Sequence, residues 1–380
     1  MILVTCPRGI PEILANEIRE LGFTVAKVHP AGVEVDAPFS AVYKLNLHLR
    51  TAHRVLYRLG EWTCSTADDM YAAVRTVAWE DWIASDGYVS VISSVDTPEI
   101  DNTQFANMRC KDAVVDRIRI TKGERPDSGP STDRRVVFLF WKGNSCMVCV
   151  DTSGKPLSDR GYRLRPHKAP LRESLAAAII LKTEWNGAGH FVNPMCGSGT
   201  LAIEAAMIAR RIPAGSLRTN FGFMHLLNWD SKEWKSVVSE ASDAIRDLPR
   251  SLKIVASDRD KFAVEASRAN ANEAGVLGDI AMGVCDFEKT MVPAHEEREG
   301  GNDIVILNPE YGLRLGNEDE LVGVYRAIGD FFKQKCSGYT GYVFTGNMNL
   351  TKQVGLRAKQ RVPFWTADIE CRLLEYELYK

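Results

Sequence analysis

The sequence predicts an α/β protein with an open, mostly parallel sheet in its carboxyl half and a smaller α+β region before it. From about Arg165 onward, near-continuous apolar strands alternate with helices, a pattern typical of parallel strands that are covered on both faces. The first 62 residues follow the order strand, helix, two strands, helix, strand, as a small ferredoxin-like unit would. A length of 380 residues suggests two or three domains.

Apolar spacing sets the expected elements of the amino half. Isoleucines and leucines three or four positions apart, from Ile10 to Leu21, indicate a helix that Gly22 ends. The stretch from Lys122 to Asp133 is rich in Gly, Pro, Asp and Ser and is expected to be a loop. The expected order is strand Met1–Thr5, helix Ile10–Leu21, hairpin Val25–Val28 and Gly32–Asp36, helix Pro38–Leu49, strand Val55–Trp62, helix Asp68–Ile83, strand Tyr88–Val95, helix Asn107–Thr121, and hairpin Val136–Trp141 and Ser145–Asp151.

The carboxyl half is expected to bind a ligand at one edge of its sheet, because open parallel sheets place ligands beyond the carboxyl ends of their strands. The expected order is helix Leu171–Trp185, strand Phe191–Val192, helix Leu201–Arg211, and strands Lys253–Ser257, Ile280–Val284, Ile304–Leu307 and Tyr339–Phe344, with helices between them. The polar residues that follow these strands are therefore the candidates for a site.

The composition is that of an ordinary globular protein, with 45% hydrophobic and 25% charged residues. No apolar run approaches the roughly 18 residues that span a bilayer, and the start of the chain lacks the sections of a signal peptide, so we expect a cytoplasmic protein with no membrane partner. The nine cysteines are scattered. Cys146 and Cys149 lie three positions apart on an expected strand and should point to opposite faces, so no metal site is predicted.

Charge is nearly balanced overall, at −2, but one stretch is basic. Between Lys155 and Arg172 a single acidic residue, Asp159, opposes six basic ones. The basic residues are Lys155, Arg160, Arg163, Arg165, Lys168 and Arg172. Such a run is most often a solvated face, and charge alone leaves nucleic-acid binding as the less common alternative.

A glycine-rich turn runs from Asn193 to Thr200, between an expected strand and an expected helix. Its glycines, Gly197 and Gly199, let the backbone approach a ligand closely and direct free N–H groups toward it. No Lys follows, so the turn is not a P-loop, and the full Gly-x-Gly-x-x-Gly pattern is absent. A plain tight turn is the alternative.

Two aspartates follow the next two strands. Asp258 comes after the second strand, where a carboxylate can accept hydrogen bonds from both ribose hydroxyls of a nucleoside. It lies 59 positions after Gly199 instead of the usual about 20, which predicts an insertion around residues 213–248. Asp286 follows the third strand, where it could meet an adenine amino group or simply cap a helix.

The fourth strand leads into Asn308, Pro309, Glu310, Tyr311 and Gly312. The Asn308 side-chain oxygen and the Pro309 carbonyl can accept the two hydrogens of an exocyclic amine, and Tyr311 can stack on a flat base. Pro309 has no N–H that would compete for the site. A β-turn after a strand is the alternative, since Asn-Pro favours turns.

These motifs resemble those of class I S-adenosylmethionine-dependent methyltransferases that methylate exocyclic amines of bases, in which Asn-Pro-Pro-Tyr is the usual form of the last motif. The amino half resembles a ferredoxin-like unit followed by an RNA-binding THUMP domain. Together they resemble the bacterial THUMP-containing 23S rRNA guanine-N2-methyltransferases in their single-enzyme form. The further stretches that carry the resemblance are Asn102–Phe105, Lys111–Asp116, Arg160–Arg163, Ala169–Ile179, Asn220–Phe223, Trp229 and Trp234.

The resemblance implies a Rossmann-like class I methyltransferase domain and a division of the chain into four parts. These are a ferredoxin-like unit at 1–62, a THUMP RNA-binding domain at 63–154, a basic linker at 155–172, and the methyltransferase domain at 173–380, with the insertion around 213–248 inside it.

The resemblance also assigns roles to residues. The implied cofactor is S-adenosylmethionine, held by Asn193, Pro194, Cys196, Gly197, Gly199, Thr200, Asp258 and Asp286. The implied catalytic residues are Asn308, Pro309 and Tyr311, with the role of Glu310 undecided because it stands where the family pattern has a second Pro. The implied RNA contacts are Lys111, Arg160, Arg163, Arg165, Lys168 and Arg172.

The expected reaction is methyl transfer to N2 of a guanine in RNA, with 23S rRNA or a pre-ribosomal particle as the substrate. The same two hydrogen-bond acceptors could bind another exocyclic amine, so guanine N2 of tRNA and adenine N6 are alternatives. A non-catalytic RNA-binding assembly factor is a further alternative, which Glu310 alone favours because the glycine-rich turn, Asp258 and Asp286 are all retained. No oligomeric state is predicted.

Overall fold

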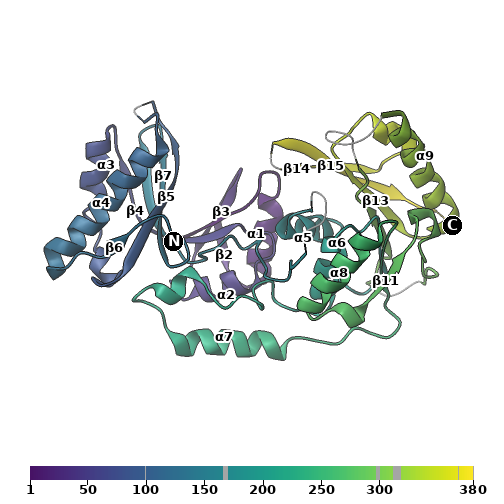
Figure 1. The fold of residues 1–380 in the computed structure, drawn as a ribbon, viewed down its shortest axis with the longest axis horizontal. Coiled ribbons are helices and arrows are strands. Elements are labelled where there is room, and N and C mark those ends of the chain that lie inside the picture. The colour runs from purple at the N-terminus through teal and green to yellow at the C-terminus, as the bar shows by residue number, and fades with distance from the viewer. Residues whose placement is uncertain (99, 166–169, 297–299, 311–317, 367, 380) are drawn as a thin grey trace. The chain divides into compact units, whose positions relative to one another are not determined.

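The structure of the protein is a computed structural model that describes residues 1–98, 100–165, 170–296, 300–310, 318–366 and 368–379. Two predicted site residues, Lys168 and Tyr311, lie outside the described residues. The chain forms two compact units (Figure 1). The amino unit contains Met1–Cys6, Leu14–Asp159 and Arg218–Glu240, and the carboxyl unit contains Pro7–Ile13, Arg160–Leu217 and Ala241–Lys380.

The amino unit is built on one eight-stranded sheet in the order β2-β3-β1-β4-β8-β7-β5-β6. β4 pairs antiparallel with β1 on one side and with β8 on the other. The strand β4 therefore joins the stretch predicted as ferredoxin-like and the stretch predicted as a THUMP domain into one sheet. The strands are β1 (Ile2–Thr5), β2 (Thr24–His29), β3 (Gly32–Asp36), β4 (Arg54–Thr63), β5 (Tyr88–Asp96), β6 (Asp127–Ser128), β7 (Arg135–Lys142) and β8 (Ser145–Asp151).

The helices of the amino half are confirmed within a few residues, with one exception. They are α1 (Pro11–Glu20), α2 (Ala41–His48), α3 (Ala67–Val74) and α4 (Thr103–Lys122). The helix expected over Asp68–Ile83 is wrong beyond Val74, because the fully buried Trp79 donates its indole N–H to the Val74 carbonyl at 2.8 Å and so satisfies the helix end. A short 3-10 helix, η1 (Trp79–Asp81), follows, and the loop expected over Lys122–Asp133 contains the two-residue strand β6.

Cysteines contribute to the core between α3, α4 and the sheet. Cys64, Cys110 and Cys146 are fully buried in the same cluster as Trp79 and Trp141. Burial raises the pKa of Cys110 to about 12, so the thiol stays protonated and packs as a small apolar group. Within the described residues, no group of three His, Cys, Asp or Glu side chains could hold a metal ion.

The segment Arg218–Glu240, predicted as part of an insertion in the methyltransferase domain, belongs to the amino unit. It carries most of α7 (Ser231–Asp243), whose Trp234 lies 6.4 Å from the ring of Tyr43 on α2. Phe223 lies closer, with its ring centroid 4.9 Å from that of Tyr43. These aromatic contacts make the segment part of the core of the amino unit.

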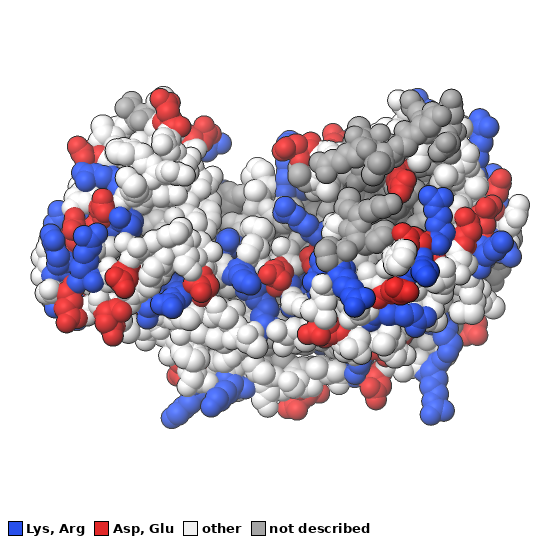
Figure 2. All heavy atoms as spheres, in the orientation of Figure 1, with Lys and Arg blue, Asp and Glu red and all other residues white. Residues whose placement is uncertain are grey.

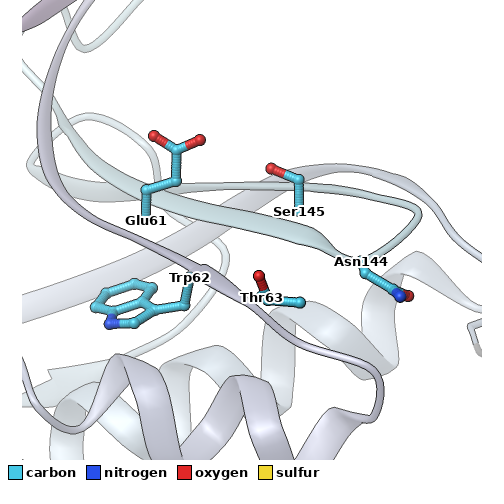
Figure 3. Close-up of a pocket in the computed structure, with 5 residues that line it drawn as sticks. All are labelled: Glu61, Trp62, Thr63, Asn144 and Ser145. Carbon is cyan, nitrogen blue, oxygen red and sulfur yellow. The ribbon is translucent and has the colours of Figure 1, made fainter.

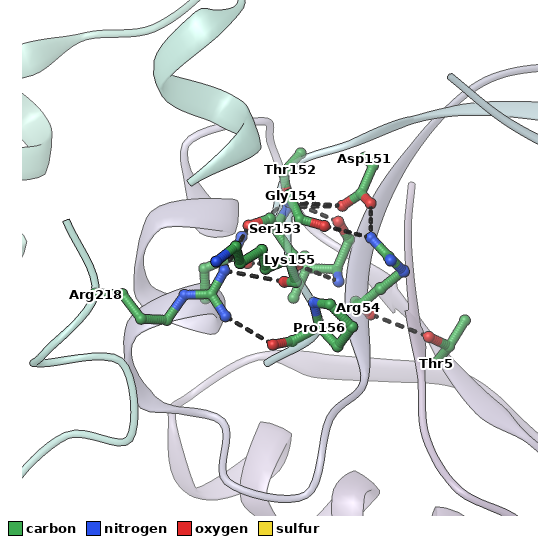
Figure 4. A network of polar contacts seen from close by, with 11 residues as sticks. Thr5, Arg54, Asp151, Thr152, Ser153, Gly154, Lys155, Pro156 and Arg218 are labelled. Atoms are coloured by element: carbon green, nitrogen blue, oxygen red, sulfur yellow. Dashed lines mark hydrogen bonds and ion pairs between the residues drawn. The ribbon is translucent and has the colours of Figure 1, made fainter. Parts of the chain in front are cut away.

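Arg218 fastens the start of this segment to the turn after β8 (Figure 4). Its guanidinium donates to the main-chain carbonyls of Ser153, Lys155 and Pro156 at 2.8 to 2.9 Å. It also lies over the ring of Phe221, 4.9 Å from the centroid. The planar fork of an arginine suits this role because it donates several hydrogen bonds at once.

The carboxyl unit is built on a seven-stranded sheet in the order β11-β10-β9-β12-β13-β15-β14. β9 to β13 are parallel, and β15 runs antiparallel to β13 and β14. The predicted open, mostly parallel sheet is confirmed, whereas the closing hairpin β14–β15 was not predicted. The strands are β9 (Phe191–Pro194), β10 (Ile254–Asp258), β11 (Ile280–Val284), β12 (Ile304–Leu307), β13 (Thr340–Thr345), β14 (Gln360–Thr366) and β15 (Ile369–Glu377).

The strand order creates a switch point between β9 and β12. The chain runs outward from β9 through β10 to β11, then returns to β12 and continues to β13 on the other side. Ligands of open sheets bind at such points. The helices of this unit are α5 (Glu173–Lys182), α6 (Thr200–Ala209), α8 (Lys261–Glu273) and α9 (Glu318–Lys335). Over the described ranges, every helix is too short or too polar to cross a membrane.

Arg218→Ala should destabilise the amino unit. The change removes charge-assisted hydrogen bonds to four carbonyls, that of Asp159 included, and the contact with Phe221, and we expect the free energy of unfolding to fall by about 2 kcal/mol or more. Thermal denaturation followed by circular dichroism would measure the effect. Arg125→Ala, at an exposed loop position, is the matched control, and equal midpoints for the two variants would contradict the prediction.

Candidate functional site

The predicted site residues of the carboxyl unit meet at one edge of its sheet. Asp258 ends β10 and Asp286 follows β11, while the glycine-rich turn follows β9 and Asn308 follows β12. These four strands are parallel neighbours. Their carboxyl ends therefore lie side by side, and segments that are far apart in the sequence are brought together at the switch point.

Two hydrogen bonds fasten the glycine-rich turn to β10. The Cys196 N–H donates to the Ser257 carbonyl at 2.9 Å, and the Gly197 N–H donates to Asp258 Oδ2 at 2.9 Å. Asp258 Oδ1 accepts from the Asp260 N–H at 3.0 Å. The Asp258 carboxylate is thus oriented by the backbone on both sides, and because a carboxylate has about four acceptor positions, it keeps capacity for a ligand.

The two glycines of the turn have different surroundings, although both have positive φ, 55° at Gly197 and 84° at Gly199. A Cβ at Gly199 would lie 2.1 Å from Ser267 Oγ on α8, so no side chain fits there. A Cβ at Gly197 would meet no described atom within 4 Å. Gly199 therefore serves helix packing, whereas Gly197 borders open space from which a ligand can approach the backbone.

The other predicted cofactor residues of the turn are mostly interior. Asn193 is fully buried and donates from Nδ2 to the Ile306 carbonyl at 2.9 Å, which ties β9 to β12. Pro194 is buried at the end of β9, and Thr200 is buried at the start of α6. Burial raises the pKa of the Cys196 thiol to about 12, so this group is not a nucleophile at neutral pH. These residues hold the shape of the turn.

Asp286 occupies the cap position that its sequence context left open. Its Oδ1 accepts from the Glu288 N–H at 3.1 Å, at the start of the short helix η4 (Phe287–Lys289). The cap uses one acceptor position of the carboxylate. A contact of Asp286 with an adenine amino group stays a prediction.

The side-chain oxygen of Asn308 is a buried hydrogen-bond acceptor. Within the described residues, its Oδ1 is buried and has no hydrogen-bond partner, as is also true of Asn193 Oδ1. A buried carboxamide oxygen without a donor is costly and uncommon. The next residue, Pro309, is buried and has no N–H, and Glu310 is exposed. An N–H donor from a bound molecule would satisfy Asn308.

Two of the predicted RNA-binding arginines are turned inward. Arg160 is only 1% exposed and pairs with the fully buried Glu204, whose Oε1 also accepts from the Tyr162 hydroxyl at 3.0 Å. Arg163 donates from Nε to Glu173 Oε1 at 2.8 Å. The assignment of Arg160 to RNA is thus corrected, because a buried and paired guanidinium cannot reach a phosphate. Arg163 keeps 18% of its side chain exposed while its charge faces a carboxylate, and a contact of Arg163 with RNA stays a prediction.

The other predicted RNA contacts are accessible. Arg165 and Arg172 are exposed, and Lys111 is partly exposed on α4, 3.2 Å from Asp112. Figure 2 shows basic and acidic side chains interspersed over the face drawn, in agreement with the small net charge. The charge distribution on this face therefore does not by itself mark an RNA-binding surface.

A hollow of about 430 Å³ lies in the amino unit, at the end of β4 and the turn before β8 (Figure 3). Glu61, Trp62, Thr63, Asn144 and Ser145 line it. Glu61 and Trp62 are consecutive on a strand and point to opposite faces, as Figure 3 shows. The polar groups do not converge on one point, so we assign no ligand to this hollow.

Residues 160–375 match the family described as RMKL-like, methyltransferase domain. The chain belongs to this family. Residues 1–56 of this RMKL-like protein match the RlmL ferredoxin-like domain, and residues 64–151 match the THUMP domain. The family resemblance stated from the sequence is therefore confirmed.

A curated relative from Syntrophotalea carbinolica, named ribosomal RNA large subunit methyltransferase K/L, is 35% identical over 98% of this RMKL-like chain and 53% of its own length. The chain thus spans about half the length of the curated relatives it matches.

Two solved structures share the whole fold of this RMKL-like chain. The structure of SMU.472 complexed with SAH has a TM-score of 0.89 at 26% identity, and the match covers 100% of this chain and 98% of that one. A protein from Listeria monocytogenes, named as a predicted N6-adenine-specific DNA methylase, has a TM-score of 0.87 at 27% identity and covers 99% and 96%. The predicted fold class is confirmed.

Gly199→Ala should destabilise the carboxyl unit far more than Gly197→Ala. Both changes place a Cβ at positive φ, but only the one at Gly199 meets Ser267. We expect the thermal midpoint to fall by several degrees more for Gly199→Ala, since about 1 kcal/mol shifts the midpoint of a domain of this size by roughly 2–4 °C. Calorimetric unfolding would measure both. Adding Ser267→Ala should recover part of the loss, and no recovery would contradict the steric explanation.

Proposed function

We propose that this protein transfers a methyl group from S-adenosylmethionine to the exocyclic N2 amine of a guanine in ribosomal RNA. The observation that carries the proposal is the buried Asn308 Oδ1, which has no hydrogen-bond partner among the described residues. Asn308 follows β12, the strand that pairs with β9, and β9 leads into the glycine-rich turn. The family match supports methyl transfer. Relatives named as ribosomal RNA methyltransferases support the class of substrate.

The residues at the sheet edge fit S-adenosylmethionine, which supplies an electrophilic methyl group when bound. Gly197 leaves the backbone open to a ligand, and the Asp258 carboxylate, held by two backbone N–H groups, would accept hydrogen bonds from the ribose hydroxyls. Asp286 would meet the adenine amino group. The neighbouring structure of SMU.472 is complexed with SAH, which supports this cofactor.

Asn308 and Pro309 would bind and orient the acceptor amine. The N2 lone pair of guanine is delocalised into the ring, which makes it a weak nucleophile. Acceptance of the two amine hydrogens by Asn308 Oδ1 and the Pro309 carbonyl would turn the amine and favour the transition state, in which positive charge develops on nitrogen. By holding the amine beside the bound cofactor, these residues would also contribute through proximity and orientation. Glu310, exposed at the next position, would pass the released proton to water.

The amino unit would bind the RNA and orient the target base. It contains the THUMP match. Along the sequence we propose the divisions 1–62, 63–154, 155–172 and 173–380 for the functional parts of the chain, although residues 160–172 fold with the carboxyl unit and residues 218–240 with the amino unit. Lys111 of the amino unit, and Arg165 and Arg172 of the carboxyl unit, would contact phosphates, which position RNA without reading its sequence. A base stacked in a helix cannot reach such a site, so the target guanine would be unpaired or flipped out.

Adenine N6 is a second candidate acceptor. The Listeria neighbour named as a predicted N6-adenine-specific DNA methylase favours it. Asn308 Oδ1 would accept a hydrogen bond from any exocyclic amine. Guanine N2 of tRNA requires no change at the site. The alternative of a non-catalytic assembly factor is supported by Glu310 alone. Each alternative gives a different product, or none, when RNA is methylated in vitro.

Asn308→Ala should abolish most methyl transfer without weakening substrate binding. Loss of one acceptor that acts mainly in the transition state should lower the single-turnover rate on the order of a hundredfold. The measurement is transfer of labelled methyl to protein-free ribosomal RNA, followed by mass spectrometry of the nucleosides. We expect N2-methylguanosine as the product.

The matched control is Asn272→Ala, at an exposed position of α8, which should transfer methyl at the wild-type rate. If the product is N6-methyladenosine, the acceptor is adenine N6 and not guanine N2. If only tRNA is methylated, the substrate is tRNA and not ribosomal RNA. Robust transfer by Asn308→Ala would remove this segment from the chemistry. No transfer by the wild-type protein, with S-adenosylmethionine bound, would favour the assembly factor.

Asp258→Asn should weaken cofactor binding by about tenfold or more, because the ribose hydroxyls lose a charged acceptor. Isothermal calorimetry with S-adenosylmethionine and no RNA would measure the affinity. Asp330→Asn, on the exposed face of α9, makes the same chemical change outside the site and should bind as the wild type does. Equal affinities for the two variants would exclude Asp258 from the cofactor site.

A further inference from the structure

Arg163 reaches the glycine-rich turn with its guanidinium. Besides Glu173, it donates from Nη1 to Ser198 Oγ at 3.3 Å and from Nη2 to Thr200 Oγ1 at 3.2 Å. A further bond from Nη2 to the Leu171 carbonyl is 2.7 Å long. The side chain is 18% exposed. All three guanidinium nitrogens are therefore engaged inside the carboxyl unit, and two of the contacts are residues on either side of Gly199.

Asn270 holds the same turn from α8. Its Oδ1 accepts from the Leu164 and Arg165 N–H groups, both at 3.0 Å. Its Nδ2 donates to the Arg165 carbonyl and to the Ser198 carbonyl, both at 3.1 Å. A carboxamide can make about four hydrogen bonds, and Asn270, which is 1% exposed, makes all four. It joins the backbone next to Arg163 to the backbone of the glycine-rich turn.

These contacts fix Ser198 by its side chain and by its backbone at once. Arg163 binds the Ser198 hydroxyl and Asn270 binds the Ser198 carbonyl, while Asp258 binds the Gly197 N–H. Ser198 itself is 5% exposed, so the contacts form in a region of low water access, where hydrogen bonds and ion pairs are stronger. The turn is thereby held from three directions with little freedom to change shape.

We infer that Arg163 and Asn270 are positioning residues that set the shape of the Gly197–Thr200 turn for the cofactor, and that Arg163 does not bind RNA. The inference rests on the proposed function in that it takes this turn as part of the S-adenosylmethionine site. It gives Arg163, which the basic stretch suggested as an RNA contact, a role in the cofactor site. A rigid turn lowers the ordering cost of ligand binding, so loosening it weakens cofactor affinity before it affects the chemistry.

Arg163→Lys separates the two roles. Lysine keeps the positive charge that a phosphate would need but loses the planar fork that reaches Glu173, Ser198 and Thr200 together. We expect the affinity for SAH, measured by calorimetry, to fall by about tenfold or more. Binding of protein-free large-subunit ribosomal RNA and its salt dependence should stay within about twofold of the wild type.

Asn270→Asp tests the second residue. Aspartate has the same shape but cannot donate, and it places a negative charge against the carbonyls of Arg165 and Ser198. We again expect weaker SAH binding and unchanged RNA binding. In steady-state kinetics both variants should raise KM for S-adenosylmethionine while kcat at saturating cofactor stays within about threefold, because the reacting groups are untouched.

Arg361→Lys on β14 and Asn272→Asp on α8 are exposed controls that make the same chemical changes elsewhere in the carboxyl unit. If Asn270→Asp does not fold, judged by its thermal midpoint, Arg163→Lys decides the matter. Unchanged SAH affinity in the folded variants, with normal binding by the wild type, overturns the positioning role. Arg163→Gln, which removes the charge, should leave the salt slope for RNA unchanged, and a slope lower by roughly 0.7–0.9 overturns the inference in favour of an RNA contact. Absence of SAH binding by the wild type overturns the proposed function itself and, with it, this inference.

Discussion

The site depends on the parallel pairing of β9 with β10 on one side and β12 on the other. This pairing brings Asp258, the glycine-rich turn and Asn308 to one edge of the sheet, although more than one hundred residues separate the first strand from the last. A shift of the pairing by one residue would turn Asp258 to the other face of the sheet, because side chains alternate along a strand. The buried bond from Asn193 Nδ2 to the Ile306 carbonyl links β9 to β12 and helps to fix this register.

Two arginines of the basic stretch between Lys155 and Arg172 form buried or partly buried polar contacts inside the carboxyl unit. Arg160 meets Glu204, and Arg163 meets Glu173, within the carboxyl unit. Removing such charges from water is costly, so they are stable only where partners satisfy them, and loss of one partner destabilises strongly. The contacts extend to the turn through Asn270. The shape of the glycine-rich turn therefore depends on buried and partly buried side chains that lie outside it.

The sequence predicted the order of elements and the edge at which the candidate site lies, because the apolar periods and the strand-ending polar residues are local signals. It did not predict the end of α3 at Val74, because the cause is the packing of Trp79. It also misjudged Arg160, because composition reveals a charge but not the Glu204 carboxylate that meets it from α6. Asn270 carried a usable signal, since it follows Ala263 and Ser267 along the buried stripe of α8, where a polar side chain needs partners.

The central position of β4 in the eight-stranded sheet has a consequence for dividing the protein. β4 gives one edge to β1 and the other to β8, so both parts of the amino unit share its backbone hydrogen bonds. A fragment that begins after Thr63 would leave β8 as an edge strand, with a row of unpaired N–H and C=O groups that can pair with another chain. The separated fragment would tend to self-associate, whereas the intact unit keeps this edge covered by its own strand.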